Sequence, residues 1–77
     1  MNKNDWISVK DNHPEIIKKY STSEWVLVDW EFEGMRKKVV VMAYLDNLGI
    51  WHTSAGHIAH SKNENAPTVW MSLPELP

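Results

Sequence analysis

The chain has 77 residues, no cysteine and a formal charge of −2. This length predicts a single domain, 1–77, with a small core. The lack of cysteine excludes disulfides and thiolate chemistry, and the near-neutral charge provides no basic stripe for nucleic acid. The start is polar, and the longest apolar run, 39–45, is too short to cross a bilayer. We therefore expect a cytoplasmic protein with no nucleic-acid or membrane partner.

A short helix is expected near the start of the chain. Asn12–Glu15 is typical of a turn that leads into a helix, because Pro14 suits the first helical position. Ile16 and Ile17 would face the core, and the polar segment 20–23 would end the helix after about one and a half turns.

A hairpin is expected in the middle of the chain. Residues 24–32 alternate, with Val26, Val28, Trp30 and Phe32 on one face. A turn containing Gly34 leads to a partner strand over 37–45. The acidic residues of the first strand would then face the basic residues 36–38 across the pair.

The second strand of this hairpin is apolar on both faces. Val39, Val41, Ala43 and Leu45 would share one face, and Val40, Met42 and Tyr44 the other. A strand of this kind needs cover on both faces. Either the ends of the chain or a partner protein would cover the second face.

Two further strands complete the predicted sheet. After a turn at 46–49, residues 50–53 form a third strand, and 68–71 form a fourth. Residues 54–66 are expected to form a loop, with one helical turn near 56–60. The fold class is therefore mainly β with a small α component: an antiparallel sheet of about four strands and one short N-terminal helix.

Three histidines lie close together in sequence. His52, His57 and His60 could provide nitrogen ligands for zinc. Their spacing differs from the pair of histidines four residues apart that binds zinc on a helix. The alternative is a polar loop that happens to contain histidine, so we expect no cofactor.

The sequence does not suggest a catalytic site. Asp29 and Glu31 lie on one strand face, but a solvated acidic row beside lysines lacks the raised pKa that acid catalysis needs. No serine lies in a strained nucleophile turn, and the three glycines are isolated. We therefore expect a protein that is not an enzyme.

A protein-binding surface is the remaining hypothesis. Trp25 and Trp30 differ by five positions and point to opposite faces of a regular strand. One of them could be a contact for a protein or a sugar, because tryptophan is enriched at binding hot spots; the alternative is that a chain end covers it. The candidate contact residues are Trp25, Asp29, Glu31, Glu33, Tyr44 and Trp51. The acidic row among them could mimic a polyanion.

The ends of the chain resemble those of a known family. The start Trp6-Ile7-Ser8-Val9, the nearby Pro14 and the end Val69-Trp70-Met71-Ser72-Leu73-Pro74 are similar to the motifs of the domain of unknown function 551 family. Val26-Leu27-Val28 and Tyr44-Leu45-Asp46 resemble its internal strands. His13 and Ser72 depart from the pattern, which usually has leucine and proline there.

This resemblance implies a phage, prophage or mobile-element setting, and it provides no catalytic residue. The expected function is a small accessory protein that binds and modulates a host or phage protein without catalysis, for example as an inhibitor. Two alternatives remain: a domain that binds metal or sugar through the histidines, and a self-associating module that forms a homodimer.

Overall fold

The computed structural model describes residues 6–31 and 37–74. This part of the chain holds six strands and no helix. The strands are β1 (Ile7–Ser8), β2 (Val26–Trp30), β3 (Val39–Leu45), β4 (Ile50–Thr53), β5 (Ile58–His60) and β6 (Val69–Ser72). None of the described residues belongs to a helix long and apolar enough to cross a membrane.

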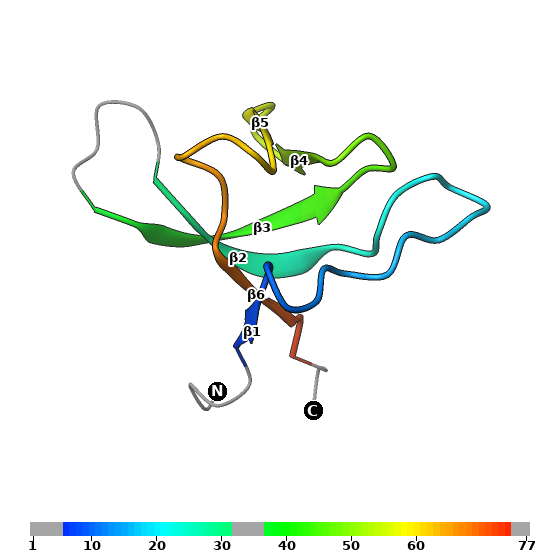
Figure 1. Cartoon of the computed structure of the whole chain (residues 1–77), viewed down its shortest axis with the longest axis horizontal. Coiled ribbons are helices and arrows are strands. Elements are labelled where there is room, and N and C mark those ends of the chain that lie inside the picture. The colour runs from blue at the N-terminus through cyan, green and yellow to red at the C-terminus, as the bar shows by residue number, and fades with distance from the viewer. Residues whose placement is uncertain (1–5, 32–36, 75–77) are drawn as a thin grey trace.

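All six strands form one antiparallel sheet in the order β1-β6-β2-β3-β4-β5 (Figure 1). The predicted fold class, a mainly β protein with an antiparallel sheet, is confirmed. The last strand in chain order lies inside the sheet, between β1 and β2. Ile7 consequently pairs with Trp70, so the two tryptophan-containing motifs at the ends of the sequence are neighbours.

The predicted hairpin is β2 and β3, in which Val28 faces Val41 and Trp30 faces Val39. Side chains along β2 are alternately buried and half-buried, as the period-two pattern predicted. Phe32, Glu33 and Gly34 lie outside the described residues.

The core lies on one face of the sheet, which we call the inner face. Its cluster of buried residues contains three of the tryptophans, and Ile7, Val9 and Ile16 from the N-terminal segment pack against it. The buried members are Val26, Val28, Trp30, Ala43, Leu45, Trp51, Ala59, Ala66 and Trp70. The segment before β2 and the loop before β6 therefore cover this face.

The predicted N-terminal helix is wrong. Residues after Pro14 run extended to Ile17, whose N–H donates to the carbonyl of Thr22 at 2.8 Å. The turn between these two residues places Ser21 at a φ of 58°. A helix needs that N–H for a carbonyl four residues earlier, and so short a helix could not compete with a cross-chain bridge.

The predicted count of four strands and the helical turn near 56–60 are also wrong. β1 has two residues and β5 has three, which is too short to show alternation in sequence. β5 follows a turn at Gly56, which has a φ of 89°. The N–H of Gly56 donates to the carbonyl of Thr53, and the N–H of Thr53 donates to the carbonyl of His57. The turn therefore joins β4 to β5 as a hairpin.

Candidate functional site

The face of the sheet opposite the core is the candidate functional site, and we call it the open face. Alternation along each strand places the side chains that point away from the core on this face. Its apolar members are Trp25, Leu27, Val40, Met42, Tyr44 and Ile58. Several of them are strongly exposed: 39% of Trp25, 56% of Val40, 45% of Met42 and 65% of Ile58.

An aromatic row crosses the open face. Tyr44 lies opposite His52, and their rings stack with centroids 4.8 Å apart and planes 13° apart. On the other side of Tyr44, the ring of Trp25 meets it edge to face at 4.9 Å. His52 in turn lies opposite Ile58. Edge-to-face and offset-stacked pairs are the favoured arrangements of aromatic rings, so the row is a preordered surface.

A second row lies beside the first. Leu27 faces Met42 on one side and Met71 on the other. Val40 follows, opposite Asp29. The open face thus has apolar side chains on β2, β3 and β5, with His52 of β4 between Tyr44 and Ile58. The two-faced pattern predicted for β3 is confirmed, and its second face is the exposed one.

Asp29 holds the start of β6 in place. Its Oδ1 accepts hydrogen bonds from the backbone N–H groups of Thr68 at 2.7 Å and Val69 at 3.0 Å, and its Oδ2 accepts one from the Thr68 hydroxyl at 2.6 Å. Lys38 forms an ion pair with the same carboxylate at 3.1 Å. Partial burial raises the pKa of Asp29, but these hydrogen bonds outweigh it and leave the pKa below its usual value.

Asp46 holds the turn between β3 and β4 in a similar way. Its Oδ1 accepts from the N–H groups of Leu48 and Ile50, and its Oδ2 lies 2.7 Å from Nε2 of His52. Burial raises the pKa of Asp46, and the hydrogen bonds from His52 and the two backbone groups lower it further than burial raises it. This contact also orients the His52 ring against Tyr44.

The candidate contact residues lie in different parts of the structure. Trp25 and Tyr44 lie together on the open face. Trp51 is completely buried in the core, so its side chain is not part of any surface. Asp29 forms an ion pair with Lys38 of the same chain. Glu31 is half-buried, and Glu33 lies outside the described residues. Sequence analysis did not include Val40, Met42 and Ile58 among the contact residues, although it assigned Val40 and Met42 to the second face of β3.

The three histidines do not gather around one point. His52 is bound to Asp46, and Nδ1 of His60 accepts a hydrogen bond from the N–H of Lys62 at 3.1 Å. His57 lies in the turn before β5, next to Thr53. Within ranges 6–31 and 37–74, no group of three or more His, Asp or Glu side chains is placed to hold a metal ion.

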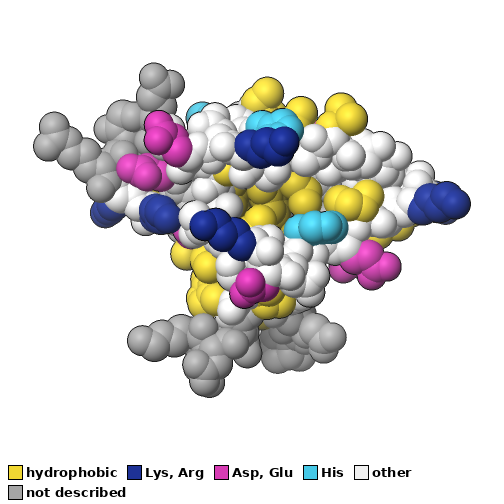
Figure 2. Space-filling model, viewed as in Figure 1, with side chains coloured by type: hydrophobic (Ala, Val, Ile, Leu, Met, Phe, Trp, Pro, Cys, Tyr) yellow, Lys and Arg dark blue, Asp and Glu magenta, His cyan; other side chains and the backbone are white. Residues whose placement is uncertain are grey.

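Charges of both signs are interspersed on the molecule. On the face drawn in Figure 2, hydrophobic side chains gather at the centre, with Lys, His and acidic side chains around them. Such mixing does not favour one sign of ligand over the face that is drawn.

No family model, no curated protein and no solved structure matches this chain. The resemblance to the domain of unknown function 551 family therefore rests on the motifs quoted above and stays a prediction.

Proposed function

We propose that the chain is an accessory protein of the phage or mobile-element type that binds a host or phage protein and modulates it without catalysis. The observation that carries this proposal is the open face, where Trp25, Val40, Met42 and Ile58 are exposed together. Four large apolar side chains at these exposures amount to a few hundred Å², the size of the largest apolar patch on a typical monomer, which is often functional.

The composition of the open face supports a protein as the partner. Trp and Tyr are enriched among the residues that dominate binding energy, and Met is enriched at interfaces. Tyr44 is held between Trp25 and His52. Because these rings are already ordered, binding would cost little side-chain entropy. The contact surface that we propose is Trp25, Val40, Met42, Tyr44 and Ile58.

An affinity pull-down from a bacterial host lysate, followed by mass spectrometry, is the first test. Met42→Lys places a charge at the centre of the open face, and Trp25→Ala removes its largest side chain. Leu48→Lys is the matched control, because Leu48 is 70% exposed in the turn after β3 and is not part of a strand of the open face. We expect one partner that the Leu48→Lys protein retains and both other variants lose.

The second test measures the Kd of each variant for the purified partner. Loss of a hot-spot side chain costs about 2 kcal/mol or more, which corresponds to about a 30-fold weaker Kd for Trp25→Ala. A partner that binds all three variants with equal affinity would exclude the open face as the contact surface.

Self-association is a second candidate, and the charges on the open face favour it. Asp29 is paired with Lys38, and Asp46 with His52. Two copies could therefore meet face to face without repulsion between these two carboxylates. Light scattering across a concentration series tests this candidate. A dimer that Met42→Lys dissociates and Leu48→Lys does not would support it, and a monomer at every concentration would exclude it.

A further inference from the structure

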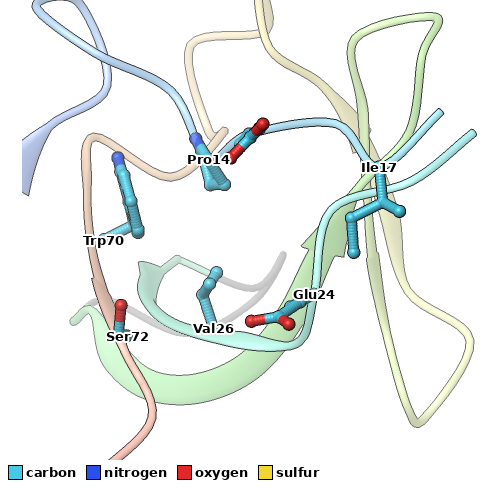
Figure 3. A pocket seen from close by; sticks show the side chains of 7 residues that line it. Pro14, Ile17, Glu24, Val26, Trp70 and Ser72 are labelled. Carbon is cyan, nitrogen blue, oxygen red and sulfur yellow. The ribbon is translucent and has the colours of Figure 1, made fainter.

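A small cavity on the other side of the molecule from the open face has a distinct chemistry. It lies between the start of β2, the end of β6 and the N-terminal segment, and its volume is about 250 Å³. Figure 3 shows Trp70 and Ile17 on opposite sides of it, with Pro14 above and Val26 below. Its walls therefore combine apolar and polar side chains in similar measure.

Two exposed carboxylates belong to the lining of the cavity. Glu15 and Glu24 both line the cavity, and the Glu24 side chain extends toward the space above Val26 (Figure 3). Neither carboxylate has a hydrogen-bond or ion-pair partner within the described part of the chain. No lysine, arginine or histidine is among the described residues that line the cavity. The charged side chains among these described lining residues are therefore all negative.

The third feature is the indole of Trp70. Its N–H already donates to the carbonyl of Asn12 at 2.7 Å, which fixes the ring and satisfies its one donor. The part of the ring that borders the cavity consequently offers only its π system and C–H groups. An aromatic π system attracts cations, and tryptophan is the strongest of the side chains that do so. The Ser72 hydroxyl adds a further acceptor on the wall.

We propose that this cavity binds the side chain of a lysine or arginine presented by a protein. An aliphatic stem would lie against Val26, Ile17 and Pro14, and the cationic end would meet the carboxylates and Trp70. A cavity of about 250 Å³ is smaller than the ~300–1,000 Å³ of small-molecule sites. Its size therefore fits one side chain better than a cofactor.

The charges that line a second, larger concavity do not indicate a ligand of one charge. A groove of about 710 Å³ runs between Ser8–Lys10 and the loop before β6. Lys10, Lys62 and Glu64 all line it, so its charges have both signs. Of these two concavities, the cavity beside Trp70 is the one whose described lining has charges of a single sign.

The inference does not rest on the proposed function of the open face. The cavity is formed by Val26, Trp70 and Ser72, whose side chains are on the inner face. Changes at Trp25 or Met42 leave its lining residues intact. The two surfaces can therefore be tested separately in one set of variants.

The test is an NMR titration of the folded protein with N-acetyl-lysine methylamide, followed through the indole N–H signal of Trp70. The matched probe is N-acetyl-norleucine methylamide, which has a similar stem and no charge. We expect a saturable shift of the Trp70 signal with the lysine probe and none with the norleucine probe. Added salt should weaken the lysine binding, because the carboxylates are exposed.

Glu15→Gln and Glu24→Gln identify the carboxylates. Each should weaken the lysine binding about two- to fivefold, the range for a part-exposed ion pair, and the double variant should weaken it further. Glu64→Gln is the matched control, because it removes an exposed carboxylate that does not line the cavity. It should bind the lysine probe like the unchanged protein.

Two outcomes would overturn the inference. One is a lysine probe that gives no more effect than norleucine. The other is a shift with Ca²⁺ and none with lysine, which would make the two carboxylates a metal site. If either occurs while Met42→Lys still abolishes partner binding, the cavity inference fails and the proposed function stands. If the lysine probe binds and the open-face variants leave partner binding unchanged, the cavity inference stands and the proposed function of the open face fails.

Discussion

The two faces of this sheet contain the same residue types, which are buried on one face and exposed on the other. Trp30, Trp51 and Trp70 are buried on the inner face, whereas Trp25 is 39% exposed on the open face. Val28 is fully buried, and Val40 on the neighbouring strand is 56% exposed. Hydrophobicity does not separate these residues. Position along the alternating strand decides which face each one occupies. Within the described part of the chain, the segment before β2 packs on the inner face, whereas Trp25, Val40, Met42 and Ile58 of the open face stay exposed.

The largest expected effect is on the inner face. Trp51→Ala should destabilise the protein by about 3–5 kcal/mol, the usual cost of removing a buried tryptophan. Small domains are stable by only about 5–15 kcal/mol, so this variant should be close to unfolded. Chemical denaturation measures it. Trp25→Ala is the counterpart on the open face, and an equal loss there would contradict the division into two faces.

Trp51→Phe sharpens the same point. The Nε1 of Trp51 is buried and has no hydrogen-bond partner. Phenylalanine removes this unsatisfied N–H while it keeps one ring. We expect Trp51→Phe to lose clearly less stability than Trp51→Ala in the same denaturation experiment.

A buried polar group gives the next effect. Ser23 Oγ accepts a hydrogen bond from the N–H of Leu45 at 2.9 Å and donates one to the carbonyl of Glu24 at 2.8 Å. Ser23→Ala leaves the buried N–H of Leu45 without this acceptor, which should cost about 1–3 kcal/mol. Ser54→Ala, at an exposed position in the turn after β4, is the control and should change the denaturation midpoint little.

The pH dependence of stability should follow Asp29 and Asp46. Both have a pKa lowered in the folded protein. The stability that each provides is complete above the unfolded pKa of about 3.9 and is lost as the pH falls through the lower folded value. Thermal melting between about pH 5 and pH 2 should show this loss. Asp29→Asn and Asp46→Asn should each flatten the curve, and a variant that keeps the full slope would show that its carboxylate is not responsible.

The smallest effect on stability is expected on the open face. Met42→Lys and Val40→Lys should change the free energy of unfolding by about 0.5 kcal/mol or less, as exposed substitutions usually do. The same variants should abolish whichever association the open face supports. A stability loss of several kcal/mol would instead mean that the folded chain covers this face.

Sequence analysis predicted the central elements of the fold. The alternation in 24–32 is long enough to identify β2, and the two-faced pattern of β3 indicated a second apolar face that a chain end or a partner would cover. It could not predict β1 or β5, since two or three residues show no period. Pro14 and two isoleucines suggested a helix where the bridge between Ile17 and Thr22 exists instead.

The candidate site was only partly predictable for a related reason. Trp25 and Tyr44 are 19 positions apart, and only the β2–β3 register brings their rings together. Trp51 and Trp25 are both tryptophans and look alike in the sequence, yet Trp51 is buried on the inner side of β4. The lysine-binding cavity was not predictable, because Glu15 and Glu24 meet Trp70 only once β6 pairs with β2.

The position of β6 also sets the order in which the sheet can assemble. β2, β3, β4 and β5 pair with their neighbours in sequence, so their hairpins can close early through short loops. β1 leaves the ribosome first and has no partner until β6 follows more than sixty residues later. A nascent chain that stops before Val69 would expose one edge of β2 and leave Trp6–Ser8 unpaired. Completion of the fold therefore waits for β6, and until then the unpaired edge is open to chaperones and to aggregation.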